Sequence, residues 1–321
     1  MLRLTGEEYR PHRMWAVLLA LGAALAYAGA SVLQQREAHL DRGSADGNGA
    51  GQGAGGGVRL VLRLARRPVW LAGLACDGLG YALQALALGL GELLVVQPVI
   101  TSGILFALPV SAWWAGRRLT RGEFAWACIL AAGLIGFLLL AESGGGKDFA
   151  SSRAWIACAA IAGPVIAGCV IAATRSTGTA RAVLFAFATG TLFGVTAALT
   201  KSTVVLLGHH GVGALAHWEP YALLVLGATG FVLNQRAFQA GALTASLPTL
   251  TVVEPVVAVL VGITMLDESI PVHDAVDAIA LVLSVVAMVA STVVLSRAAA
   301  RHDEIHEHQL ADALTRPRPA R

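Results

Sequence analysis

The chain has 321 residues, of which 56% are hydrophobic and only 13% are charged. Its mean hydropathy is +0.68, whereas average soluble domains carry about 25% charged residues, so the composition excludes an ordinary soluble protein. The net charge of +3 comes from basic residues at the ends of apolar runs rather than in one patch, and we expect no nucleic-acid partner.

Nine apolar runs are each long enough to cross a lipid bilayer as a helix, which needs about 20 residues. In chain order the predicted spans are residues 14–35, 68–89, 92–115, 122–142, 154–174, 181–207, 218–238, 242–266 and 274–296. A Gly-rich loop, about residues 37–67, separates the first two spans, and its composition is that of a flexible linker. We predict an all-α polytopic membrane protein.

The two halves of the chain are related in sequence. Nine of 30 positions are identical when residues 72–101 are laid over residues 222–251, and they include Gly80/Gly230 and Pro98/Pro248. Matched Gly and Pro carry most weight, because these residues determine backbone geometry. At a second offset, the residues around Tyr27 match those around Phe193.

This repeat predicts the organisation of the chain. Residues 14–142 form a first repeat of four helices, residues 143–180 a bridging fifth helix and residues 181–296 a second repeat of four helices, followed by a charged tail at 297–321. Helix 6 follows helix 1 by five crossings, an odd number, so the second copy enters the membrane from the opposite side. Such inverted-topology repeats are typical of secondary transporters.

The distribution of Lys and Arg predicts the orientation. Seventeen of the 23 lie on the face that holds the C-terminus and five on the face that holds the N-terminus. Because short cytoplasmic loops are rich in Lys and Arg, we expect a multi-pass plasma-membrane protein with residues 1–13 outside and the C-terminus in the cytosol. Four acidic residues are then expected at the outer end of the last hairpin, namely Asp267, Glu268, Asp274 and Asp277.

Three ionisable residues lie inside the predicted spans, where a charge costs about 2.5–3.5 kcal/mol. They are Asp77, Lys201 and Glu254. In a functional interpretation Glu254 binds a proton or cation within the membrane, with Lys201 as its switchable partner. In the alternative, Lys201 and Glu254 form a fixed ion pair that locks two helices, and Asp77 makes an interhelical hydrogen bond.

Neutral polar residues and prolines complete the candidate pathway. Gln84 and Asn234 are matched by the repeat, and they line a central cavity or act as polar contacts between helices. Pro98, Pro248 and Pro255 lie inside apolar runs, where proline breaks of a helix mark substrate sites in transporters or are plain packing kinks.

Two local motifs are structural. Gly190 and Gly194 form a small-xxx-small motif for close helix approach, and Thr120-Arg121-Gly122-Glu123 is a capping box that opens the fourth span. The four cysteines fall inside apolar runs without a C-x-x-C pair, so we expect neither a disulfide framework nor a metal site. No nucleotide-binding or hydrolase motif is present, and we expect no cofactor and no enzyme activity.

Several segments resemble a known family. They are Gly80 to Leu88, Val96-Gln97-Pro98, Phe106-Ala107-Leu108-Pro109, Arg117 to Phe124, Ala245-Ser246-Leu247-Pro248, Glu254-Pro255 and Leu266-Asp267-Glu268. Together they resemble the drug/metabolite transporter (DMT) superfamily of the EamA-like kind and its relatives, the NIPA-type magnesium transporters. Members of the superfamily commonly have ten spans with both ends cytosolic, so nine spans favour the NIPA-like arrangement.

The leading hypothesis is a secondary transporter of small metabolites or drugs that works by alternating access, with Glu254 as a proton-coupling site. Lys201, Asp77, Gln84 and Asn234 then line the pathway. A NIPA-like magnesium or divalent-cation transporter is the first alternative, and a membrane scaffold or accessory subunit without transport is the second. The expected partners are a small-molecule or ion substrate, the lipid bilayer and a second copy of the chain in a homodimer.

Overall fold

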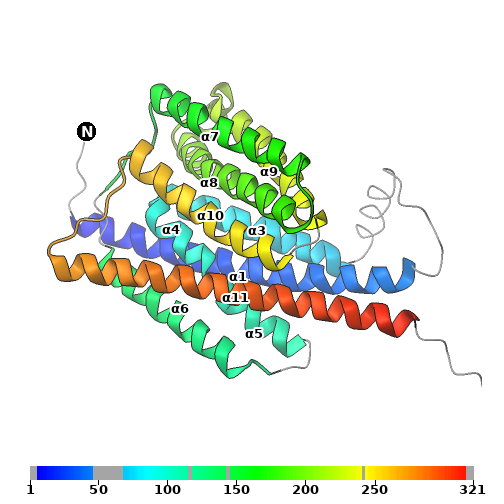
Figure 1. Cartoon of the computed structure of the whole chain (residues 1–321). Helices are drawn as coiled ribbons and strands as arrows, with labels where there is room; N and C mark the ends of the chain where they lie inside the picture. Colours follow the sequence, from blue (N-terminus) through cyan, green and yellow to red (C-terminus); the bar gives the residue numbers. More distant parts are fainter. Residues whose placement is uncertain (1–5, 46–67, 115–117, 142–144, 241–242, 316–321) are drawn as a thin grey trace, which may run out of the picture.

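The computed structural model describes residues 6–45, 68–114, 118–141, 145–240 and 243–315. Within these ranges every regular element is a helix, and the helices form one bundle (Figure 1). They are α1 (Gly6–Ala45), α3 (Pro68–Leu90), α4 (Leu93–Thr101), α5 (Ile104–Trp114), α6 (Arg121–Leu140), α7 (Ser152–Thr174), α8 (Gly178–His210), the short 3-10 helix η1 (Gly211–Ala216), α9 (Glu219–Gln239), α10 (Leu243–Met265) and α11 (Ala275–Thr315).

Eight segments in the described part of the chain are helical, long and apolar enough to cross a membrane. They are residues 12–31, 71–90, 93–113, 121–140, 152–174, 178–216, 244–265 and 275–301. α9 occupies the seventh predicted span, residues 218–238, and has 21 residues, but it is more polar than these eight. The predicted all-α class is confirmed, and the segments are compatible with a multi-pass membrane protein.

Helix ends agree with the predicted spans except at the two chain ends. α1 continues to Ala45 and α11 to Thr315, so the first part of the predicted Gly-rich loop and most of the charged tail are helical extensions of the spans. The rest of that loop, residues 46–67, lies outside the described residues, as do residues 1–5 and 316–321. The capping box of α6 is confirmed, because the Glu123 N–H donates to Thr120 Oγ1 at 3.2 Å and the Thr120 N–H to Glu123 Oε2 at 2.8 Å.

Only one of the three predicted proline breaks occurs. The third span is divided into α4 and α5 four residues after Pro98, where the Ser102 N–H donates to the Pro98 carbonyl at 3.2 Å. Gly103 at this break lies against α1, since a Cβ there would be 3.1 Å from the Ala24 carbonyl oxygen. The break therefore makes α4 a short half-helix inside the bundle.

Pro248 and Pro255 lie inside α10, which is continuous, so the predicted breaks at these two positions are wrong. Prolines are tolerated in membrane helices where nearby hydroxyls and neighbouring helices satisfy the backbone. The close packing of α10 along α8 keeps α10 continuous.

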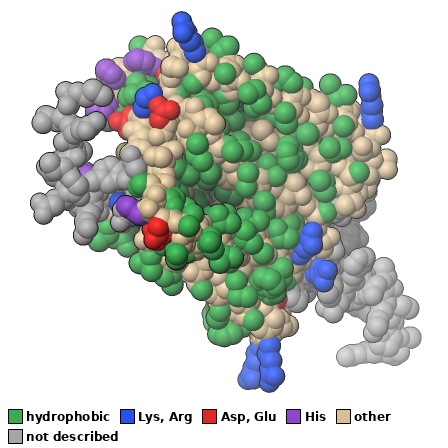
Figure 2. Space-filling model, turned by 60° about the vertical axis from the view of Figure 1, so that its left-hand side comes forward, with side chains coloured by type: hydrophobic (Ala, Val, Ile, Leu, Met, Phe, Trp, Pro, Cys, Tyr) green, Lys and Arg blue, Asp and Glu red, His purple; other side chains and the backbone are tan. Residues whose placement is uncertain are grey.

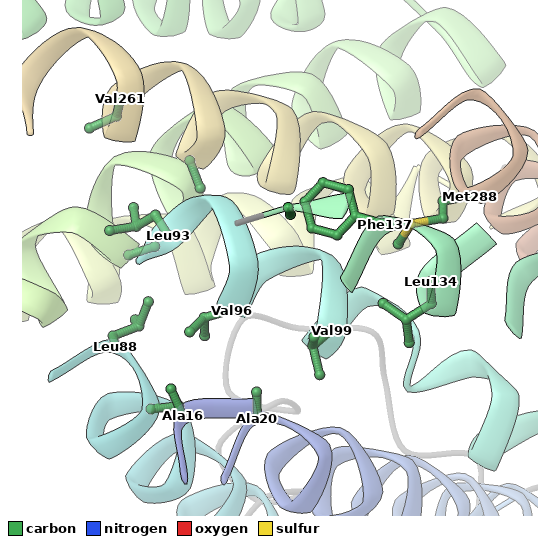
Figure 3. Packing of buried hydrophobic residues seen from close by; sticks show 14 of the residues in the cluster. Ala16, Ala20, Leu88, Leu93, Val96, Val99, Leu134, Phe137, Val261 and Met288 are labelled. Carbon is green, nitrogen blue, oxygen red and sulfur yellow. The ribbon is translucent and has the colours of Figure 1, made fainter. Parts of the chain in front are cut away.

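α4 and α8 lie in the interior of the bundle. Leu93, Val96 and Val99 of α4 are fully or almost fully buried, and Figure 3 shows α4 between α1, with Ala16 and Ala20, and α6 and α10. In the most apolar 18-residue stretch of residues 178–216, 78% of the residues are buried, compared with 6% in the corresponding stretch of α7. α8 is therefore the central helix, whereas α7 is a peripheral one.

An aromatic ring packs on a glycine in the same way in each half of the chain. A Cβ at Gly80 would lie 2.9 Å from the Tyr27 ring, and a Cβ at Gly230 would lie 2.4 Å from the Phe193 ring. α3 packs against α1 at the first contact, and α9 packs against α8 at the second. The first alignment of the two halves pairs Gly80 with Gly230, and the second pairs Tyr27 with Phe193.

The surface is apolar over most of its area. Exposed large side chains of α3, α6, α7, α9 and α11 are hydrophobic, for example Leu139, Ile161, Leu224 and Ile279. In Figure 2 hydrophobic side chains cover the face and the charged ones stand at its margins. A surface of this kind suits contact with lipid.

Candidate functional site

Glu254 lies midway along α10 at the closest contact with α8. A Cβ at Gly190 would be 3.1 Å from the Glu254 backbone nitrogen, and a Cβ at Gly194 would be 2.8 Å from the Glu254 carbonyl oxygen. The predicted small-xxx-small motif is confirmed as the contact that brings these two backbones together. The Glu254 side chain itself is only partly buried.

Polar side chains gather around Tyr27 of α1. The Tyr27 hydroxyl donates to Gln84 Oε1 of α3 at 2.6 Å. The same tyrosine lies within electrostatic range of Glu254, Tyr81 and Asp77. Of the predicted site residues, Gln84 thus contacts Tyr27 directly, and Glu254 and Asp77 lie within electrostatic range of it. The sequence had marked Tyr27 only as part of the repeat. We call Tyr27, Asp77, Tyr81, Gln84 and Glu254 the tyrosine cluster.

Tyr81 connects the tyrosine cluster to α8. Its hydroxyl lies 3.1 Å from Thr200 Oγ1, and the Thr200 hydroxyl donates to the Thr196 carbonyl at 2.8 Å. Because a hydroxyl has one hydrogen, Tyr81 is the donor to Thr200. Tyr81 is also 45% exposed, so the cluster reaches the surface of the bundle.

Lys201 is not the partner of Glu254, so the proposed Lys201–Glu254 pair is wrong. Its ammonium binds Glu268 Oε1 at 2.7 Å, and the Lys201 and Glu268 side chains are 6% and 0% exposed. Gly194, which contacts Glu254, precedes Lys201 by seven residues, which corresponds to about 10 Å along a helix. This separation accounts for the different partner.

The Glu268 carboxylate also closes the start of α4. It accepts the Leu93 N–H on Oε1 and the Leu94 N–H on Oε2, both at 3.0 Å. The next two N–H groups of α4 donate to the Glu92 carbonyl at 3.1 and 2.9 Å, so all four N–H groups at this helix end are satisfied. We call Lys201, Glu268 and the N–H groups of Leu93 and Leu94 the Lys201–Glu268 cluster.

A tight turn after α10 aims Glu268 inward. The Leu266 and Glu268 N–H groups both donate to the Gly262 carbonyl, at 3.1 and 3.0 Å, and Asp267 between them adopts a positive φ of 50°. Asp267 itself points outward and pairs with Lys147. A Cβ at Gly262 would lie 2.6 Å from Glu268 Oε2, so glycine is needed to make room for the carboxylate.

Sequence reasoning missed Glu268. It belonged to the acidic group expected at the outer end of the last hairpin, yet its side chain is fully buried, whereas Asp267 and Asp274 are exposed. One signal was available: Lys201 is the single lysine inside the spans, and a buried ammonium requires a counter-charge. The sequence could not rank Glu268 above Glu254 as that counter-charge.

The remaining predicted residues lie apart from both clusters. Asn234 of α9 is partly exposed, and no described contact joins it to Gln84. Pro98 lies in α4 between the Lys201–Glu268 cluster and the break at Ser102, and Pro255 follows Glu254 directly. In the described part of the chain no three His, Cys, Asp or Glu side chains are grouped so as to hold a metal ion.

An apolar groove of about 440 Å³ lies elsewhere, between α7, α8 and α9. Its lining is almost entirely carbon, with Trp155 and Trp218 in edge-to-face contact at 5.5 Å between ring centroids. No residue of the tyrosine cluster or of the Lys201–Glu268 cluster lines it. The groove therefore lacks the polar groups that a solute pathway needs.

Comparison with known proteins identifies a relative of nearly the same length. No protein-family model matches the chain, and no solved structure matches it. An uncharacterized protein of Corynebacterium glutamicum is 35% identical to it over 283 residues, which cover 88% of this chain and 94% of the relative. The chain therefore belongs to the same family as this uncharacterized corynebacterial protein.

Proposed function

We propose that the protein is a secondary transporter that moves a small solute across the plasma membrane by alternating access, coupled to protons through Glu254. The observation that carries the proposal is the tyrosine cluster. It places a partly exposed carboxylate, a second acidic residue and an amide among the spanning helices α1, α3 and α10. Ionisable groups at such depth are costly and mark ion or substrate pathways.

The repeated ring-on-glycine contact supports the inverted repeat that this mechanism uses. Tyr27 on Gly80 and Phe193 on Gly230 are equivalent contacts made by residues matched in sequence. Two structural repeats with a polar region near their contact can move as rigid bodies against each other around that region. The same feature supports our assignment to the DMT superfamily, with nine spans, an external N-terminus and a cytosolic C-terminus.

The two clusters suggest which end of the pathway is closed. The Lys201–Glu268 cluster is fully buried, and it ties α8, the α10–α11 connection and α4 together. The tyrosine cluster, in contrast, includes the exposed Tyr81 and the partly exposed Glu254. We infer a conformation in which the Lys201–Glu268 end, the outer end in our orientation, is shut.

Proton-coupled transport by purified protein in liposomes tests the proposal. Solute-driven proton movement is followed with a trapped pH dye for the wild type, Glu254→Gln and Asp148→Asn, which removes an exposed carboxylate. We expect Asp148→Asn to match the wild type and Glu254→Gln to lose the proton signal. Equal rates in all three proteins would remove Glu254 from the mechanism. If no solute drives proton movement in any of them, the scaffold alternative would be favoured.

A divalent-cation carrier is the second candidate, and one observation favours it. Lys201 is neutralised by Glu268 at 2.7 Å and so does not oppose a cation at Glu254. A trapped magnesium dye in the same liposomes separates the two functions. Magnesium entry that Glu254→Gln abolishes, without solute-driven proton movement, would replace the first proposal by this one.

A further inference from the structure

A mostly polar pocket lies between the start of α8 and the end of α9. It has a volume of about 310 Å³ and is lined by Arg181, Arg236, Gln239 and Ala240. Arg181 belongs to the first turn of α8 and Arg236 to the last turn of α9. Both are on the face that the distribution of Lys and Arg predicts to be cytosolic. The pocket therefore joins two cations from different helices at one surface of the bundle.

Neither guanidinium has a counter-charge in the described part of the chain. No ion pair there joins Arg181 or Arg236 to a carboxylate. Arg181 is positioned instead by the Phe185 ring, whose centroid lies 5.8 Å from the guanidinium carbon. Two guanidinium groups around one cavity thus keep N–H donors available for an anion.

The helices around the pocket supply no negative charge near it. α7 and α8 contain no Asp or Glu, and the acidic residue of α9, Glu219, is at the opposite end of that helix, about 25 Å from Arg236. The partial charges of the α8 start and the α9 end are opposite in sign and oppose each other, so the two arginines determine the potential in the pocket. An arginine in the last turn also stabilises a helix end, but that role requires neither a cavity nor a second cation.

An exposed apolar stripe of α9 leads away from the pocket along the helix. At intervals of three or four residues, one face of α9 carries Val225, Thr229, Val232 and Arg236. Val225 and Val232 are 62% and 52% exposed, and the Thr229 hydroxyl donates to the Val225 carbonyl at 2.8 Å, so its hydrogen is satisfied without water. The polar side chains of α9 are concentrated instead in residues 234–239. This arrangement matches a lipid whose head group lies at the pocket and whose chains lie along the stripe.

We propose that Arg181 and Arg236, together with Gln239, bind the phosphate group of an anionic phospholipid of the cytosolic leaflet, whose acyl chains lie along the exposed stripe of α9. Arginine binds phosphate oxygens through paired N–H donors, and basic pockets between spanning helices on the cytoplasmic side bind anionic head groups. A free phosphate ester would use the same donors but would gain nothing from the stripe. The site is separate from both clusters and does not depend on the transport function.

Lipid binding to the purified protein in detergent tests the site. The probes are phosphatidylglycerol, phosphatidylcholine with the same acyl chains, and glycerophosphoglycerol, which is the first head group without chains. We expect phosphatidylglycerol to stay bound in native mass spectrometry and to raise the melting temperature by about 3 °C or more. The other two probes should bind at least about tenfold more weakly. Equal stabilisation by glycerophosphoglycerol would assign the pocket to a free phosphate ester, and equal stabilisation by phosphatidylcholine would exclude a site for anionic lipid; either result overturns the proposal.

Two variants with the same change of charge separate the pocket from general attraction to anionic lipid. Arg181→Gln/Arg236→Gln removes both cations of the pocket. Arg118→Gln/Arg121→Gln removes two exposed arginines on the same face that do not line it. We expect the first variant to bind phosphatidylglycerol at least about tenfold more weakly than the wild type, and the second to bind it equally well. Equal losses in the two variants, or no loss in the first, overturn the proposal.

Two further measurements cover the case in which Arg181→Gln/Arg236→Gln does not fold. Arg236→Gln alone changes one exposed side chain and should still weaken binding of phosphatidylglycerol. Raising the salt concentration from 0.1 to 1 M shortens the Debye length from about 10 Å to about 3 Å, so the affinity of the wild type should fall. Unchanged affinity in Arg236→Gln, or in the wild type at high salt, overturns the proposal.

Discussion

The Lys201–Glu268 cluster and the tyrosine cluster are both polar groups inside an apolar bundle, yet they differ in how completely they are buried. In the first, one carboxylate meets three donors and neither charged side chain is more than 6% exposed. In the second, Tyr27 and Gln84 share one short hydrogen bond, Tyr81 is bound to Thr200 but exposed, and Glu254 is partly buried. A fully buried and satisfied cluster locks helices together, whereas a partly exposed one is available to a solute or a proton.

Lys201→Met should give the largest effect, because it leaves the Glu268 carboxylate buried without its counter-charge. Breaking a buried ion pair from one side costs about 3–5 kcal/mol. We expect a melting temperature well below that of the wild type in the same detergent, and partial recovery in Lys201→Met/Glu268→Gln. A Lys201→Met protein as stable as the wild type would mean that the cluster does not hold α4, α8 and the α10–α11 turn together.

Gly194→Ala should give an intermediate effect, because it tests the packing beneath Glu254. The added Cβ would lie 2.6 Å from Val257 Cβ and 2.8 Å from the Glu254 carbonyl oxygen. Overpacking of this kind costs about 1–3 kcal/mol. Gly168→Ala on α7 is the matched control, since a Cβ there meets nothing within 4 Å. Thermal unfolding of both variants should show a loss for Gly194→Ala only, and equal losses would contradict the close α8–α10 contact.

Tyr27→Phe should give the smallest loss of stability, because it deletes one hydrogen bond to Gln84, worth about 1 kcal/mol. The comparison between the clusters predicts that its transport rate falls more than its stability. Tyr221→Phe, which removes a bond to the Leu215 carbonyl at 2.9 Å near η1, is the control with unchanged transport. If the two variants transport equally well, the tyrosine cluster lies off the pathway.

Local features were predictable because each depends on residues close together in the chain. Helix ends such as those of α6 and α7 follow from apolar run length, and the Thr120–Glu123 box from four consecutive residues. The Gly190–Gly194 contact followed from a spacing on one helix face. Glu254 and Asp77 were selected because a charge inside a span is unusual, and the structure brings both near Tyr27.

Features that depend on contacts between residues far apart in the chain were not predictable. Pro98, Pro248 and Pro255 look alike in sequence, but only the first precedes a break, because Gly103 admits the α1 backbone at that point whereas α10 is held along α8. Tyr27 could not be paired with Gln84, since 57 residues separate them.

By itself the sequence determined that the chain forms apolar helices of membrane length, because backbone groups among apolar side chains must be satisfied within each helix. It also determined which residues would carry charge among those helices. Only the tertiary structure decided that Lys201 binds Glu268, 67 residues away, and that this carboxylate also caps α4. The physical reason is that a buried charge accepts any suitably placed counter-charge, and its placement depends on how three separate segments, α4, α8 and the α10–α11 turn, pack together.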